Sequence, residues 1–260
     1  SICRIDCNES VELARLIFDF GKHAAEEDGV SGWSKLAIIA HHDCLGDLIT
    51  LSPLLFNQHI PVFYIRELGV IDNATAASIQ GGDFTDLIAL GVDKHIPDTF
   101  LAACATHGVK SERLIGKNPY DANEKINDLI TSGQVEGARL TIDNLIVSSV
   151  WNPADAFAAG AWAAKTDSAF LLEDPQNLDS VAHAISYVKK KGGSVKHLTF
   201  LGDSSQFGRL DKEMLGKAVQ EALVDAGLAD TGTEDAQPAE TERTDFTFAD
   251  AASANTQENE

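Results

Sequence analysis

The chain carries LAIIAHHDCLGDLITLSPLLFNQHIPVFYI at residues 36–65 and a similar stretch, DNLIVSSVWNPADAFAAGAWAAKTDSAFLL, at residues 143–172. A shift of 108 residues places Ile38 on Ile146, Asp47 on Asp155 and Phe63 on Leu171. Identity is low, but each stretch runs from an apolar segment through a polar loop and a helical segment to a second apolar segment. Self-similarity at a fixed spacing is typical of repeat architectures. The sequence therefore predicts one structural unit present in two copies.

The similarity continues on both sides of these stretches with small gaps. Arg4-Ile5 falls on Arg113-Leu114, and DLIALGVDKHIPDTFLAACA (86–105) falls on HLTFLGDSSQFGRLDKEMLG (197–216). Each copy then has roughly 110 residues, which is within the usual size of a domain.

We predict a first copy over residues 1–112, a second copy over residues 113–228, and an acidic tail or linker over residues 229–260. The predicted strands cover residues 1–5, 35–41, 60–65, 86–90, 111–116, 143–149, 168–172 and 196–201. The predicted helices cover residues 9–25, 45–57, 72–80, 97–107, 119–132, 153–165, 178–191 and 210–227.

The predicted strands are apolar on both faces and alternate with helical segments. LAIIA (36–40) and HLTFL (197–201) are examples of such strands. Strands of this kind belong to parallel sheets that are covered by helices on both sides. The fold class is therefore α/β, with two tandem Rossmann-like repeats and parallel sheets.

The chain is acidic, with a formal net charge of −20, and the acids are concentrated near its end. Residues 224–260 hold ten acidic residues and one arginine. The tail after Leu228 has too few aliphatic residues to offset the entropy of ordering, so we expect it to be disordered. The charge argues against nucleic acid and anionic lipid as partners. No segment approaches the roughly 20 apolar residues of a membrane span, so we expect no membrane insertion.

The second copy resembles the cell wall-binding repeat 2 family of Gram-positive surface proteins. The resemblance is carried by RLIGKNPYDANEKI (113–126), by the stretch at residues 143–172 quoted above, and by HLTFLGDSSQF (197–207). The matching positions, from both copies, are Arg113, Gly116, Asp155-Ala156, Phe170-Leu171-Leu172 and Gly202, and then Arg4, Asp47-Leu48, Pro53, Pro61-Val62-Phe63-Tyr64 and Gly91. Together the two copies cover nearly all of residues 1–223.

The resemblance implies repeats that pack against one another and hold a surface or S-layer protein on the cell wall. The expected partners are an anionic cell wall polymer or a peptidoglycan-linked glycan, and other copies of the repeat. The expected location is outside the cell, on the cell wall. The chain opens on Ser1 with a strand-like segment, so we interpret it as a mature or excised part of a longer protein.

Six residues are the candidate polymer-binding set. Open α/β sheets bind ligands beyond the carboxyl ends of their strands, which selects the loops after the two central strands. Asp47 and Asp155 each lie in the first turn of the following helix, where a carboxylate is also stabilised by the helix dipole by about 0.3–1 kcal/mol. The full set is Arg4, Asp47, Arg113, Trp151, Asn152 and Asp155.

The sequence predicts neither an enzyme nor a metal or cofactor site. It has no Gly-x-Ser-x-Gly elbow, no Gly-x-Gly-x-x-Gly fingerprint and no phosphate-binding loop. The run His41-His42-Asp43-Cys44 contains metal-ligand residue types, but neighbouring side chains at a strand end alternate in direction, which argues against convergence on one ion.

The preferred function is therefore a non-catalytic attachment module. Two alternatives stay open. The repeats could serve only as a protein–protein interface or spacer, or the chain could be a wall hydrolase that acts through Ser148, Ser149 or His42.

Deleting residues 229–260 is expected to leave the melting temperature unchanged, because a disordered tail makes no stabilising contacts. The measurement is thermal denaturation of the full and shortened chains, followed by circular dichroism. A drop of several degrees, or hydrogen-exchange protection within the tail, would show that it is docked.

Overall fold

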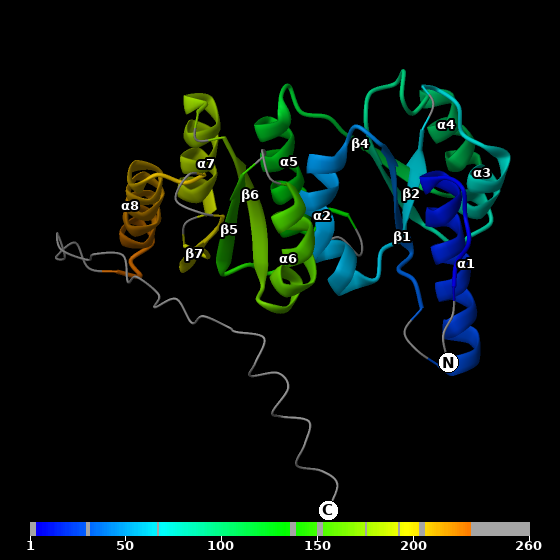
Figure 1. Cartoon of the computed structure of the whole chain (residues 1–260), viewed down its shortest axis with the longest axis horizontal. Coiled ribbons are helices and arrows are strands. Elements are labelled where there is room, and N and C mark those ends of the chain that lie inside the picture. Colours follow the sequence, from blue (N-terminus) through cyan, green and yellow to red (C-terminus); the bar gives the residue numbers. More distant parts are fainter. Residues whose placement is uncertain are drawn as a thin grey trace, which may run out of the picture. The chain divides into compact units, whose positions relative to one another are not determined.

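The computed structural model describes residues 4–29, 32–66, 68–135, 139–149, 153–174, 176–191, 193–202 and 206–229. In these ranges helices and strands alternate along the chain (Figure 1). The compact unit ends at Ala229, so the predicted disorder of the tail concerns residues that lie almost entirely outside the described part. No helix in the described part combines the length and the apolar run that crossing a membrane requires.

The first sheet has four parallel strands in the order β2-β1-β3-β4. Its strands are β1 (Leu36–His41), β2 (Val62–Ile65), β3 (Asp86–Leu90) and β4 (Lys110–Leu114), and its helices are α1 (Ser10–Asp28), α2 (Leu45–Gln58), α3 (Asn73–Gln80) and α4 (Asp98–Thr106). Every residue of β1 is buried. Alternate residues of this strand join two different core clusters, one with α2 and one with α1, α3 and α4. The helices therefore cover both faces of the sheet.

The second sheet has three parallel strands in the order β6-β5-β7. Its strands are β5 (Asn144–Ser149), β6 (Ser168–Glu173) and β7 (His197–Leu201), and its helices are α5 (Pro119–Ser132), α6 (Pro153–Lys165), α7 (Leu178–Lys191) and α8 (Arg209–Asp225). Helix α6 packs on one face, whereas α5, α7 and α8 share a core cluster with the other. The predicted α/β class with two parallel sheets is confirmed.

The first strand predicted in each copy, at residues 1–5 and at residues 111–116, differs from what the structure shows. Residues 4–7 carry no strand, so the prediction of a strand over residues 1–5 is wrong for its described part. The strand predicted at 111–116 is β4, but it pairs with β3 and completes the first sheet. The boundary predicted at residue 112 therefore runs through a strand, and the division into two independent domains stays a prediction.

Equivalent positions of the two copies nevertheless have equivalent roles. Helices α2 and α6 start 108 residues apart, and Asp47 and Asp155 are the third residue of each. Gly91 and Gly202, which directly follow β3 and β7, both have a positive φ, at 138° and 145°. This region of backbone space favours glycine, so a glycine with positive φ directly follows the strand in both cases.

The two copies meet where α2 packs along α6 (Figure 1). Gly160 makes this close approach possible, because a Cβ atom there would lie 2.7 Å from Ser52 Oγ and 3.0 Å from Ser52 Cβ. Nearby, Asn57 donates a hydrogen bond to the carbonyl of Ala164 at 3.4 Å, and Ile49 joins the buried alanines of α6 in one cluster. Since contacts progress in the same direction along both helices, α2 and α6 run parallel.

Two buried asparagines of α5 complete the hydrogen bonding of the edge strand β6. Asn123 and Asn127 donate to the carbonyl of Phe170 at 3.0 and 2.8 Å, and Asn123 accepts from the backbone N–H of Leu172 at 3.3 Å. Asn123 also donates to Thr50 Oγ1 of α2 at 2.8 Å. One buried amide thus links α5, β6 and the first copy.

Glu173, the last residue of β6, has a fully buried side chain with no hydrogen-bond partner for either carboxylate oxygen. Burial raises its pKa from the usual 4.5 to about 7, and the nearby Asp211 and Asp174 carboxylates add to the rise. Because the pKa is higher in the folded chain, the folded state holds this proton more tightly, and stability falls as the pH rises from about 4.5 to about 7.

Gly160→Ala is expected to destabilise the protein by about 1–3 kcal/mol, because the added methyl group forces α2 and α6 apart. Gly216→Ala is the matched control. Gly216 is also inside a helix, but a Cβ atom there meets nothing within 4 Å. Its replacement should stabilise α8 by up to about 1 kcal/mol. The measurement is urea denaturation, and equal effects at both positions would contradict the close packing.

Glu173→Gln is expected to stabilise the protein above pH 7 by about 1–3 kcal/mol and to be neutral near pH 4, where Glu173 is protonated in both folded and unfolded chains. The measurement is the free energy of unfolding across this pH range. Glu112→Gln, on the exposed part of β4, is the control. A stability difference that does not change with pH would show that Glu173 is not held protonated by burial.

Candidate functional site

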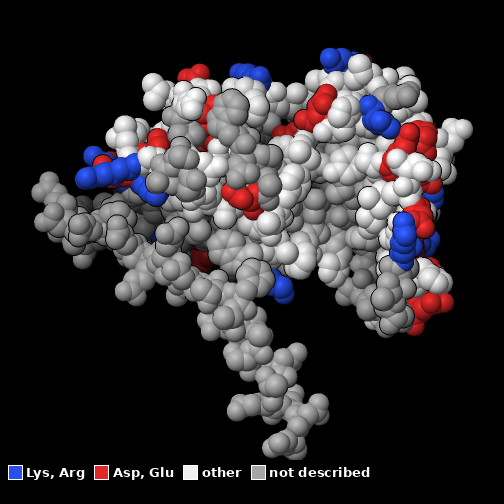
Figure 2. Space-filling view, viewed as in Figure 1, with Lys and Arg blue, Asp and Glu red and all other residues white. Residues whose placement is uncertain are grey.

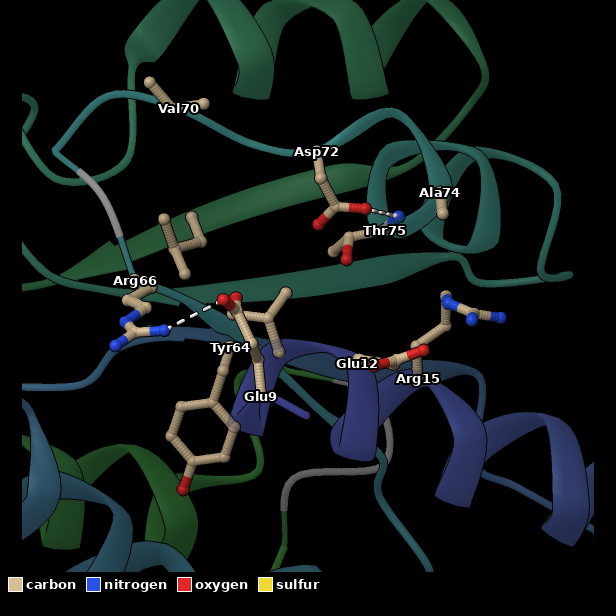
Figure 3. Close-up of a pocket in the computed structure, with 11 residues that line it drawn as sticks. Glu9, Glu12, Arg15, Tyr64, Arg66, Val70, Asp72, Ala74 and Thr75 are labelled. Atoms are coloured by element: carbon tan, nitrogen blue, oxygen red, sulfur yellow. Dashed lines mark hydrogen bonds and ion pairs between the residues drawn. The ribbon is translucent and has the colours of Figure 1, made fainter. Parts of the chain in front are cut away.

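A cavity lies beside the carboxyl end of β2. It is a groove of about 490 Å³ between the first turns of α1, the end of β2 and the start of α3 (Figure 3). Its polar side chains include Glu9, Arg15, Arg66 and Asp72. Tyr64 also borders the groove, but its ring points away from α3 and packs against the core cluster that contains α2 (Figure 3). This place agrees with the rule that open α/β sheets bind ligands beyond the carboxyl ends of their strands.

Each of the two arginines of the groove is held by an ion pair. Arg66 reaches Glu9 at 3.1 Å across the groove (Figure 3), and Arg15 pairs with Asp19 at 2.8 Å one helical turn away. The side chains of the Arg66–Glu9 pair are more than half exposed. Exposed pairs of this kind contribute only about 0–1 kcal/mol, so an anionic ligand can replace the carboxylate partner at small cost.

The acids of the groove restrict what can bind there. Asp72 is engaged as the N-cap of α3 and accepts from the backbone N–H of Thr75 at 2.9 Å, which lowers the pKa of this carboxyl despite partial burial. Glu9 and Glu12 add further negative charge. The groove is therefore mixed in charge, and an anion would have to be held locally by the arginines.

Arg4 and Arg113, which the repeat alignment places together, have different environments. Arg4 is 85% exposed and pairs with Asp6 at 2.7 Å. Arg113 is only 17% exposed and donates to the carbonyls of Gly91 at 2.5 Å and Ile96 at 2.7 Å, and to Asp98 Oδ1 at 2.5 Å. Arg113 therefore fastens the loop between β3 and α4, and this use leaves little of its guanidinium for a polymer.

Asp47 and Asp155 occupy matching positions in the first turns of α2 and α6. Burial raises the pKa of Asp47 from 3.8 to about 6. Trp151 and Asn152 lie outside the described residues. Of the six candidate polymer-binding residues, the structure gives the two aspartates equivalent places, and it does not assemble the set into one described pocket. Their role in binding stays a prediction.

The three lysines at the end of α7 are already paired. Lys189 contacts Glu221 at 2.9 Å, Lys190 contacts Asp128, and Lys191 contacts Asp128 at 3.3 Å. On the described part of the face in Figure 2, basic and acidic groups form small separate patches. No broad basic surface is visible there.

Sequence reasoning missed the groove residues, although one signal pointed to them. Arg66 directly follows the strand predicted at residues 60–65, so the strand-end rule selects it as readily as it selects residues after the central strand. Arg15 carries no such signal, because it lies in the middle of a helix that only the folded chain brings beside β2.

The fold is similar to that of two cell wall proteins of Clostridium difficile, Cwp6 and Cwp8. The likeness to Cwp6 covers 82% of this chain with a TM-score of 0.63 at 15% identity, and the likeness to Cwp8 covers 77% with a TM-score of 0.56 at 16% identity. The matched parts make up only 31% and 32% of those two chains. No family model matches the sequence, and no curated protein matches it. At this identity the similarity shows a shared fold.

Proposed function

We propose that this chain is a non-catalytic attachment module of a bacterial cell surface, which binds an anionic wall polymer or a peptidoglycan-linked glycan and anchors a larger surface protein. The observation that carries the proposal is the similarity in fold to Cwp6 and Cwp8 over most of the chain. The chain corresponds to about a third of each of those proteins, which supports a role as one module of a larger protein.

We propose the groove beside β2 as the place of polymer contact. Arg15 and Arg66 offer guanidinium groups that suit phosphate or carboxylate. The formal net charge of −20 repels a polyanion at long range, so the attraction has to be short-ranged. Moderate salt screens the general repulsion, with a Debye length of about 10 Å at 0.1 M.

The hydrolase alternative has less support from the serines of β5. Ser148 is fully buried and its Oγ has no hydrogen-bond partner, whereas a nucleophilic serine needs a base within hydrogen-bonding distance. His42 directly follows β1 of the first sheet and contacts Asp43 at 3.0 Å. The interface or spacer alternative is distinguished by the binding experiment below.

Replacing Arg66 with Gln is expected to reduce retention on purified cell walls about tenfold, the equivalent of losing one charge-assisted hydrogen bond of about 1.4 kcal/mol. Arg15→Gln should act in the same direction. Arg209→Gln is the matched control, since Arg209 pairs with Glu213 one helical turn away, as Arg15 does with Asp19, but is 91% exposed on α8. The measurement is cosedimentation with walls across a sodium chloride series, repeated with calcium.

Retention should rise between the lowest salt and about 0.1 M and should increase further with calcium, which bridges carboxylates and polymer. A steady loss of retention from the lowest salt, with both groove variants unchanged, would contradict polymer binding and favour the interface alternative. Release of soluble wall fragments would instead favour the hydrolase.

A further inference from the structure

Three side chains with metal-ligand chemistry meet at the carboxyl end of the first sheet, apart from the groove. His41 is the last residue of β1, Asp43 lies in the turn between β1 and α2, and His95 comes from the loop between β3 and α4. One ligand atom from each of these residues lies within 4.8 Å of the other two. The sequence argument against convergence considered residues 41–44 alone, and it missed His95 because that residue is more than fifty positions away.

The spacing of these groups suits a small ion. His41 Nδ1 and Asp43 Oδ2 are 3.3 Å apart, and the rings of His41 and His95 are stacked with centroids 4.1 Å apart. Two ligands in a tetrahedral site with bonds of about 2.0–2.1 Å are roughly 3.3–3.4 Å apart. The first pair already has this separation, and the His95 ring, whose ligand atom lies within 4.8 Å of the other two, has to turn out of its stacked position to complete the set.

His41 is held there at an energetic cost. Its side chain is 2% exposed. Its Nδ1 atom faces Asp43 and accepts a long hydrogen bond from the backbone N–H of Asp43 at 3.4 Å, whereas its Nε2 atom has no hydrogen-bond partner. A buried polar group without a partner destabilises a fold by about 1–3 kcal/mol, and such groups often mark functional positions. At this buried end of β1, an apolar side chain would stabilise the fold more than His41 does.

The loop that carries His95 is also fixed in place. Arg113 binds the carbonyls of Gly91 and Ile96, on either side of His95, and Gly91 has the positive φ that lets the chain turn directly after β3. His42 contacts the second oxygen of Asp43 at 3.0 Å, as outer-shell groups do when they orient a ligating carboxylate. Cys44 donates its thiol to the carbonyl of Leu90 at 3.2 Å, so it is engaged elsewhere.

We propose that His41, Asp43 and His95 bind a divalent transition-metal ion of zinc's class, with a fourth coordination position open to water or another ligand. Two imidazoles and one carboxylate favour zinc and its neighbours over calcium and magnesium, which prefer oxygen ligands. The ion would join the turn after β1 to the loop after β3. This site does not depend on the proposed attachment function, because the groove and the histidine cluster share no residue.

The test uses the full chain, prepared with chelator and then titrated with zinc by calorimetry. We expect one zinc ion per chain with an affinity that falls at least about 100-fold in Asp43→Asn and in His95→Gln, since each variant loses one of three ligands. His23→Gln is the matched control. It removes another histidine–carboxylate pair, His23 with Glu27 at 3.2 Å, which has no third ligand among the described residues.

Two further measurements keep the result interpretable. Asp43 is 64% exposed, so Asp43→Asn should retain the melting temperature of the unmodified chain without metal. Zinc should raise the melting temperature of the unmodified chain and of His23→Gln, but not of Asp43→Asn or His95→Gln. Excess magnesium should leave zinc binding intact.

The proposal is overturned if the unmodified chain binds no stoichiometric zinc, or if Asp43→Asn and His95→Gln bind it as tightly as His23→Gln does. Displacement of zinc by magnesium would also overturn it, because the ion would then be held by the general acidity of the surface.

Discussion

The close approach of α2 and α6 is the constraint on which the arrangement of the molecule depends. Small residues allow it, with Gly160 against Ser52 and buried alanines beside Ile49. Because the two helices run parallel and each follows the central strand of its sheet, both sheets present their carboxyl ends toward the same side. The groove and the histidine cluster lie at this end of the first sheet, and β5 of the second sheet ends on the same side.

Polar groups of α5 then fix the second copy against the first. An edge strand exposes backbone groups that would otherwise pair with another chain, and Asn123 and Asn127 satisfy those of Phe170 and Leu172. The contact of Asn123 with Thr50 extends the same network to α2. The side chains of α5 therefore satisfy the edge of β6, where a further strand would otherwise pair. Through Thr50, Asn123 also fixes where α5 contacts α2.

The local sequence pattern was sufficient to predict most of the helices and strands, but it did not predict which strands pair or which loops they contact. The apolar runs at residues 36–40 and 86–90 predicted strands that the structure confirms, because burial on both faces leaves a strong local signal. The pairing of β4 with β3 was not predicted, since repeat alignment does not show which sheet a strand joins. The role of Arg113 and the convergence of His95 on His41 were also missed, because both depend on a loop whose path only tertiary contacts define.

The placement of β4 has a consequence for how such a chain can be lengthened or shortened by gene duplication. The strand aligns with the start of the second copy, yet it hydrogen-bonds within the first sheet and supplies the arginine that closes its last loop. A recombination event at the sequence boundary would therefore divide a finished sheet, even if it joined two repeats perfectly in frame. The predicted repeat and the folded sheet are offset by one strand, so the first sheet is complete only after Leu114.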